Sequence, residues 1–310
     1  MEIQDYKKNS YLSTAIFAFV VSFVASQLLL ALGNSLLATI AKYANLPIEQ
    51  VSSSLWSLAF LNIINQGTFF GVFWFVYKRN KPVFSTNIFS RPNWLILIIC
   101  IIIGVASLYL LSPVVNIVEW ALTLIPLKSG GIGFEINSFG RMIYALFILG
   151  LLPAVCEELL FRGAIFNCLR TKSHTFAIVM SAVMFGIFHM SGYQFVYPIL
   201  FGILLGLIMS KWGNIWYCII THFVNNAFVI VSNYLSPSGT LTAPTMFEIV
   251  ICILLVALFV GVIIGFSKLK LHINKEYHDL TVAHQSQFIF WIGLVCMIVI
   301  WLLVVLSGLA

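Results

Sequence analysis

The sequence predicts an all-α fold: a polytopic membrane protein, built as a helical bundle of about 8–9 transmembrane helices. Composition supports this, because 61% of the residues are hydrophobic and only 8% are charged, whereas a soluble domain has roughly 25% charged residues. The apolar residues also fall in long runs, most of which can cross a hydrocarbon core of about 30 Å at 1.5 Å per residue. Lipid rather than a water-excluded globular core would then cover most of the chain.

Nine apolar segments are separated by polar connections. The fifth and sixth are near the lower length limit for a span, so they can instead be tilted or partly re-entrant. We divide the chain into residues 1–139 with helices one to three, a core at 140–235 with helices four to seven, and 236–310 with the C-terminal helices and a cytoplasmic loop at 271–287. The nine segments are 11–41, 54–77, 94–121, 141–168, 174–190, 194–210, 214–234, 246–267 and 288–308.

The net charge of +6 comes from cations that flank apolar segments, mostly in alternate connections, with Lys42 and Lys128 as the main exceptions. Orientation signals are placed in this way, so the charge does not indicate nucleic-acid binding. The positive-inside rule places the N-terminus in the cytoplasm, and nine crossings would leave the C-terminus outside. The six cysteines are scattered through apolar stretches without a CxxC pair, and we interpret them as small buried hydrophobic residues.

Few ionisable residues lie inside the predicted spans, where a charge costs several kcal/mol. Glu119 and Glu248 lie close to an interface, where a carboxylate can reach water, so we interpret both as structural. The deeper polar residues form three patterns on the fourth, fifth and seventh helices. These are Glu157, Glu158 and Arg162; Phe185 and His189; and His222 and Asn226.

The first pattern contains two adjacent glutamates of different character. Glu158 and Arg162 are four residues apart, so one helix face can hold a charge-assisted pair that lowers the cost of burying both. Glu157 is turned by about 100° around the helix, so Arg162 cannot serve it equally well. A carboxylate without a dedicated cation in a poorly solvated site can exchange protons. Glu157 is therefore the candidate base.

The other two patterns place polar groups one helical turn apart. Phe185 lies on the same face as His189, and His222 lies beside Asn226, where both can donate a hydrogen bond to a developing oxyanion. For Asn225 we favour an interhelical hydrogen bond. Because charged groups avoid lipid, the three patterns are expected to line one polar pocket between helices four, five and seven.

Two features of the helices themselves give further expectations. Glu157 and His222 are expected in the cytoplasmic half of the membrane, whereas His189 lies about 22 Å along its helix. For these side chains to meet, either Pro153 kinks helix four, or helix five tilts or starts deeper. Gly202 and Gly206 form a GxxxG pattern that allows close helix packing. In the second span, amides at 62, 65 and 66 are interpreted as interhelical hydrogen bonders rather than pocket residues.

The motifs "EELLFR" (157–162), "FGIFH" (185–189) and "HFVNN" (222–226) resemble the CPBP family of intramembrane proteases, the CAAX protease and bacteriocin-processing family, also called Abi or Rce1-like. The resemblance covers about residues 140–235. It implies that Glu157 and His189 activate a water and that His222 and Asn226 stabilise the oxyanion. It further implies supporting roles for Glu158, Arg162 and Phe185.

Members of this family are named as metalloproteases, so a zinc ion is possible, with Glu157, His189 and His222 as its ligands. However, the chain has no HExxH motif, and an asparagine one turn after His222 suits an oxyanion hole better than a zinc shell. We therefore favour a metal-free, glutamate-type endopeptidase without a cofactor.

Other functions remain open at the level of sequence. A proton-coupled transporter would also bury Glu, His and Asn, although no inverted repeat is apparent. A non-enzymatic peptide binder, such as a bacteriocin immunity protein, is a second alternative. The lack of any aspartate within the spans excludes a two-aspartate protease. The expected partners are the bilayer and a peptide or membrane-protein substrate, with no nucleic acid and an open oligomeric state. The resemblance implies a bacterial cytoplasmic membrane.

Overall fold

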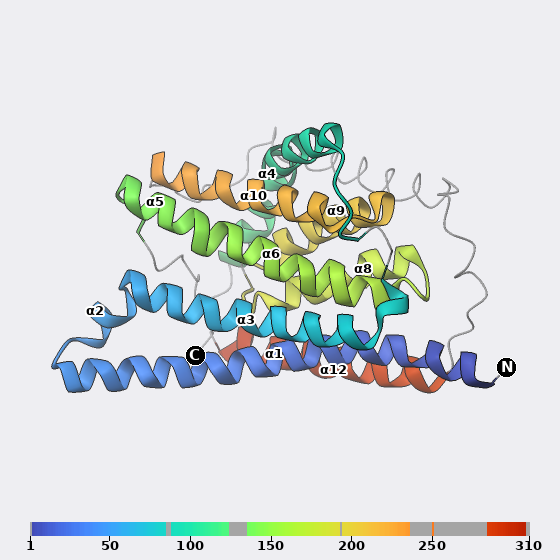
Figure 1. The fold of residues 1–310 in the computed structure, drawn as a ribbon. Helices are drawn as coiled ribbons and strands as arrows, with labels where there is room; N and C mark the ends of the chain where they lie inside the picture. Colours follow the sequence, from blue (N-terminus) through green and yellow to red (C-terminus); the bar gives the residue numbers. More distant parts are fainter. Residues whose placement is uncertain are drawn as a thin grey trace.

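The computed structural model describes residues 2–84, 88–123, 135–192, 194–235, 250 and 284–307. Within these ranges the chain is helical and contains no strand, which confirms the all-α class. Long helices lie side by side in a bundle (Figure 1). The predicted span at 246–267, with Glu248, and most of the loop at 271–287 lie outside the described residues.

The described residues contain six helices that are long and apolar enough to cross a membrane. Two shorter apolar helices, α8 and α9, have 15 and 17 residues, so α8 is only about 22 Å long. The protein is thus an integral membrane protein, but a count of eight or nine spans is not confirmed. The six spans correspond to α1 (Glu2–Ala44), α3 (Leu55–Arg79), α4 (Trp94–Thr123), the stretch Phe139–Leu169, α10 (Ile215–Leu235) and α12 (His284–Ser307).

The remaining elements are short or join these spans. The helix α2 (Ile48–Ser52) precedes α3, and η1 (Lys81–Val83) follows it. The shorter apolar helices are α8 (His174–Phe188) and α9 (Val196–Trp212). The stretch Phe139–Leu169 consists of α5 (Phe139–Ala145), η2 (Leu146–Leu151), α6 (Leu152–Glu158), η3 (Leu159–Ile165) and α7 (Phe166–Leu169).

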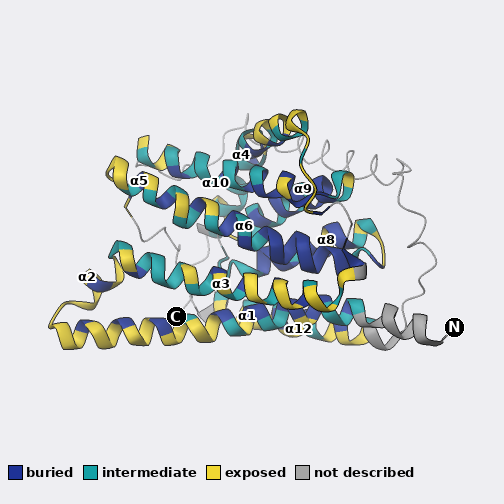
Figure 2. Cartoon of the chain, in the orientation of Figure 1, coloured by how far each residue is buried: buried dark blue, intermediate teal, exposed yellow. Residues whose placement is uncertain are grey.

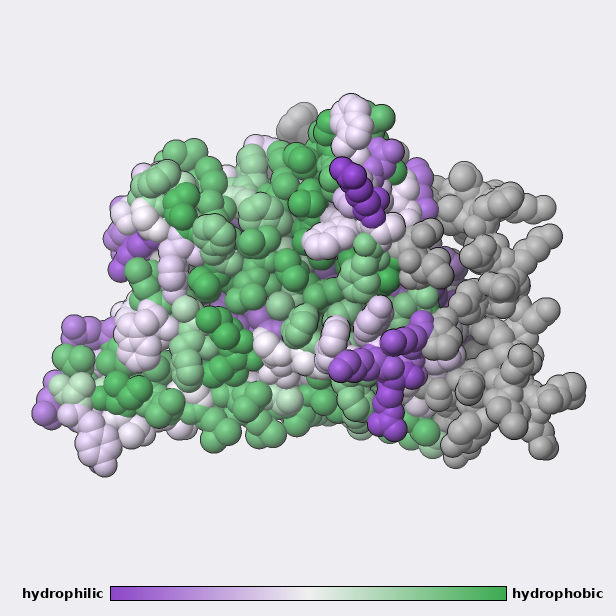
Figure 3. All heavy atoms as spheres, in the orientation of Figure 1, coloured by the Kyte–Doolittle hydropathy of each residue, from purple (hydrophilic) through white to green (hydrophobic). Residues whose placement is uncertain are grey.

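The outside of the bundle is apolar, as a lipid-facing surface must be. Large side chains of α1 such as Leu28 and Leu32 are 61% and 65% exposed. Hydrophobic residues cover the middle of the visible face, and hydrophilic side chains lie towards the helix ends (Figure 3). Burial is greatest where η3, α7 and α8 meet (Figure 2).

The stretch from α5 to α7 is the centre of the bundle. Its α6 segment contacts both α3 and α10, while η3 contacts α1, α3, α8 and α9. Side chains on α6 and η3 therefore face other helices rather than lipid. This position explains how the chain keeps Glu158 and Arg162 fully buried.

Two π-helical turns, η2 and η3, flank α6. Helical geometry continues through Pro153, which lies in the first turn of α6. Asn167 donates hydrogen bonds from Nδ2 to the carbonyls of Arg162 and Gly163, at 2.8 and 2.7 Å, within and just after the second of these turns. Turns of this kind occur often at functional sites. A kink at Pro153 was one of the alternatives predicted from the sequence, whereas these π-helical turns were not predicted.

Three described connections that carry or adjoin basic residues, at 80–93, 170–173 and 212–214, meet at one end of the bundle. Arg170 donates from Nη2 to the carbonyl of Val83 at 2.9 Å. Nearby, Asn214 donates from Nδ2 to the carbonyl of Ser90 at 2.8 Å, and the amide of Ile215 bonds to Ile88 at 3.0 Å. This grouping agrees with the sequence, in which basic residues occur in alternate connections, because alternate connections of a spanning bundle lie on the same side of the membrane. Assigning this end to the cytoplasm stays a prediction of the positive-inside rule.

The GxxxG glycines allow α9 to approach α8 closely, as predicted. A Cβ atom on Gly202 would lie 3.0 Å from Cα of Ala182 and 3.3 Å from Nη2 of Arg162. A Cβ atom on Gly206 would lie 3.3 Å from Cα of Ile178. Backbone atoms at these distances cannot rotate away as a side chain can.

Gly202→Ala is therefore expected to destabilise the bundle by about 1–3 kcal/mol, the cost of overpacking a close contact. The measurement is thermal unfolding of the purified protein in detergent. Gly67→Ala is the matched control, because no heavy atom lies within 4 Å of its added Cβ and a helical glycine gains about 0.5–1 kcal/mol on this change. Equal melting temperatures for the two variants would contradict the assigned contact.

Candidate active site

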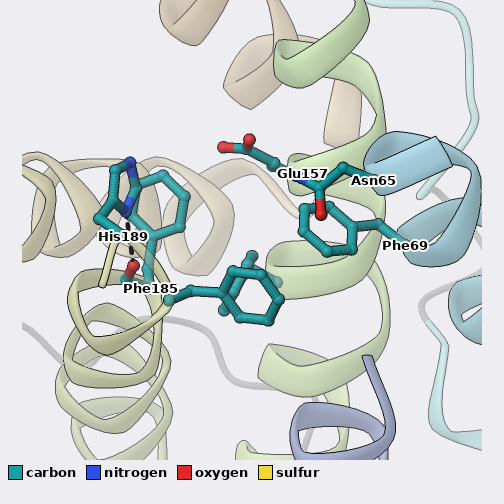
Figure 4. Close-up of a pocket in the computed structure, with 7 residues that line it drawn as sticks. Asn65, Phe69, Glu157, Phe185 and His189 are labelled. Atoms are coloured by element: carbon teal, nitrogen blue, oxygen red, sulfur yellow. Dashed lines mark hydrogen bonds between the residues drawn. The ribbon is translucent and has the colours of Figure 1, made fainter. Parts of the chain in front are cut away.

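A small cavity lies between α3, α6, η3 and the end of α8. Its volume is about 180 Å³, which is room for a few water molecules. The polar side chains that line it are Asn65, Glu157 and His189, and the remaining lining is phenyl rings. Glu157 projects from α6 into the space that His189 faces from the end of α8 (Figure 4). The structure thus brings the predicted base and one predicted imidazole into one cavity.

The His189 ring is held in a defined orientation. Its Nδ1 lies 2.9 Å from the carbonyl oxygen of Phe185. Because a carbonyl can only accept, Nδ1 carries the proton, and Nε2 of the neutral ring is left as an acceptor. The Phe185 ring packs edge-on against the imidazole at a centroid distance of 4.9 Å. The predicted pairing of Phe185 with His189 on one face is confirmed.

The chain leaves the helix immediately after His189. Met190 has a φ of 51°, in the left-handed region that usually belongs to glycine. A bulky residue there is strained, and such strain clusters at functional sites. The turn ends α8, and His189 is the C-terminal capping residue of this helix. Sequence reasoning missed this feature, because methionine carries no turn signal.

Glu158 is the centre of a buried ionic network. Its Oε1 accepts hydrogen bonds from Nη1 of Arg162 at 2.9 Å and from Nδ1 of His222 at 2.8 Å. The side chains of Glu158 and Arg162 are fully buried and that of His222 is 5% exposed. The predicted pair between Glu158 and Arg162 is confirmed. The bond to His222 was not foreseen, because it joins residues 64 positions apart.

Arg162 has further partners around the carboxylate. Its Nη2 donates to the carbonyl of Gly202 at 3.2 Å. Its guanidinium also lies over the Phe185 ring, 4.7 Å from the centroid, a favourable cation–π arrangement. Phe185 packs against His222 as well, at 5.9 Å between ring centroids. One phenyl ring therefore contacts a residue from each of the three predicted motifs.

His222 and Asn226 lie on α10, one turn apart. His222 is buried and Asn226 is half-buried. Neither is among the described residues that line the cavity containing Glu157. Asn225 donates from Nδ2 to Ser107 Oγ at 3.1 Å, and also to the Tyr197 hydroxyl. The interhelical interpretation of Asn225 is confirmed.

The amides of α3 differ from the interpretation made from sequence. Asn65 lines the cavity, so its exclusion from the pocket was wrong. Gln66 does bond between helices, but its partner is the candidate base: Nε2 donates to Oε1 of Glu157 at 3.1 Å. Gln66 is only 2% exposed. The available signal was the run of amides at 62, 65 and 66 in an apolar span, which puts all three on one helix face.

The three predicted zinc ligands are not grouped as a metal site in the described part of the chain. Across the described residues, no three or more His, Cys, Asp or Glu side chains are grouped so that they could hold a metal. Glu157 and His189 line the cavity, whereas His222 is not among its described lining residues. No step below is therefore assigned to a metal.

Residues 139–228 match the family of type II CAAX prenyl endopeptidases, Rce1-like. The chain carries an Rce1-like domain. The matched segment runs from the start of α5 into α10 and contains Glu157, His189, His222 and Asn226. The match supports a CAAX-type intramembrane endopeptidase for this segment of the chain. Neither the curated proteins nor the solved structures that were compared contain a match.

Proposed function

We propose that this Rce1-like protein hydrolyses a peptide bond within the membrane, using a water activated by Glu157 and His189. One observation carries the proposal: the Glu157 carboxylate and the His189 imidazole share a small cavity otherwise lined mainly by phenyl rings. A carboxylate in such a site is poorly solvated and can act as a general base towards a water held beside it.

The proposed reaction has two proton transfers at Glu157. His189 accepts a hydrogen bond from the water at Nε2, and Glu157 removes a proton as the water oxygen bonds to the carbonyl carbon. The tetrahedral intermediate carries a negative oxygen. When the carbon–nitrogen bond breaks, Glu157 returns the proton to the departing amine, so the carboxylate is regenerated.

His222 and Asn226 are proposed to stabilise that negative oxygen. Because the Glu158 carboxylate accepts from Nδ1 of His222, this nitrogen carries a proton and Nε2 is left for the substrate. Nε2 of a ring so held donates only when it carries a second proton, and together with the Asn226 amide one turn further along α10 it would then supply two donors. This role requires the scissile carbonyl to reach past Phe185 towards α10 in the bound complex.

The substrate is proposed to be a peptide segment presented at or inside the bilayer. It would enter from the cytoplasmic end, where the basic connections meet, or sideways between helices. A prenylated CAAX protein, a bacterial peptide precursor and another membrane protein all fit this description. The proposed mechanism is metal-free.

The test is cleavage by the purified protein in liposomes, with the products identified by mass spectrometry. We expect two fragments from a single peptide bond, at a rate that a metal chelator leaves unchanged. Activity that is lost with the chelator and restored by zinc would overturn the metal-free mechanism. Proton-dependent uptake without any cleaved peptide would overturn the endopeptidase itself.

A further inference from the structure

The candidate base is bonded to a residue outside the Rce1-like domain. Gln66 lies on α3, 91 residues before Glu157, and its Nε2 donates to Oε1 of that carboxylate at 3.1 Å. The family match begins only at residue 139. The family match therefore assigns no role to α3.

The position of α3 is set by close packing beside this bond. A Cβ atom on Gly163 would lie 2.9 Å from the Phe73 ring, so the absence of a side chain there lets α3 approach η3. Phe69 and Phe73 are buried, with 1% and 3% of their surface exposed. Because both rings lie on α3 within two turns of Gln66, the register of this helix against Glu157 is fixed by buried contacts.

We propose that Gln66 is a positioning residue for Glu157: it holds one carboxylate oxygen and so directs the other to the reacting water. This inference rests on the proposed function, in which Glu157 is the base. Gln66 does not line the cavity, whereas its neighbours Asn65 and Phe69 do. It therefore acts on the reaction through Glu157 rather than by touching substrate.

A neutral amide suits this task. Its N–H stabilises the ionised Glu157 carboxylate by a charge-assisted hydrogen bond. Because the amide is neutral, it forms no ion pair that would prevent the carboxylate from accepting a proton. Among the described residues, the other end of the amide, Oε1, is buried without a hydrogen-bond partner. A side chain retained only for interhelical packing would not need either polar atom.

The kinetic test compares Gln66→Leu with the matched control Asn62→Leu. Asn62 lies one turn earlier on α3, and its Oδ1 is likewise buried without a partner in the described structure, so both changes replace an amide by an apolar group. We expect kcat of Gln66→Leu to fall about 10- to 100-fold, the range for loss of a hydrogen bond to a charged group, with KM unchanged. The acid limb of its pH–rate profile should move to higher pH. Asn62→Leu should retain the wild-type kcat and profile.

A second readout does not need turnover. A hydrophobic carbodiimide reacts with protonated carboxyl groups in membranes, and mass spectrometry locates the adduct. We expect labelling of Glu157 at neutral pH to be greater in Gln66→Leu than in the wild type or in Asn62→Leu. Equal labelling, or increased labelling with an unchanged kcat, would overturn the positioning role. If the wild type cleaves nothing, the proposed function fails, and unequal labelling still shows that Gln66 holds Glu157.

Discussion

Glu157→Gln is expected to abolish detectable peptide cleavage while the protein remains folded. The amide keeps the shape of the side chain and can still contact Gln66, but it cannot accept the proton of the attacking water. General-base catalysis contributes roughly 10²–10⁴-fold, so the free-energy barrier should rise by about 3–5 kcal/mol. The measurement is the rate of product formation in liposomes, together with the melting temperature in detergent.

Glu119→Gln is the matched control for this result. Glu119 is a partly buried carboxylate on α4, outside the cavity, so the same chemical change there should leave cleavage intact. Cleavage by Glu157→Gln at the wild-type rate would show that another group is the base. Loss of folded protein in Glu157→Gln would show that the side chain is primarily structural.

Glu158→Leu is expected to have the largest effect on folding. It leaves two buried hydrogen-bond donors, the Arg162 guanidinium and the His222 imidazole, without the carboxylate oxygen that both of them contact. Removing one partner of a buried ion pair costs about 3–5 kcal/mol, because the other charge stays desolvated. Expression should fall, and the unfolding midpoint in denaturant should drop sharply.

Arg162→Met provides the comparison within the same network. It leaves the Glu158 carboxylate bonded to His222, so we expect a smaller loss of stability than for Glu158→Leu. The double variant Glu158→Leu/Arg162→Met should recover part of the loss, because neither charge is then stranded. A Glu158→Leu variant as stable as the wild type would refute the network, as would strictly additive losses in the double variant.

Among the described helices, most begin and end within a few residues of the bounds predicted from the sequence. Segment 54–77 corresponds to Leu55–Arg79 and segment 214–234 to Ile215–Leu235. The reason is that every backbone polar group in lipid must be satisfied within its own helix, so apolar runs and helices coincide. The pairing of Glu158 with Arg162 was also predictable, because a spacing of four determines contact along one helix.

Tertiary structure alone decided the contacts between helices. Sequence spacing placed His222 beside Asn226, but packing turned its Nδ1 towards Glu158. It also bonded Gln66 to Glu157 and brought Asn65 into the cavity. The rotation and depth of one helix against another depend on close contacts such as Gly163 with Phe73 and Gly202 with Ala182. Such contacts join distant parts of the chain, so they cannot be inferred from the local periodicity of the sequence.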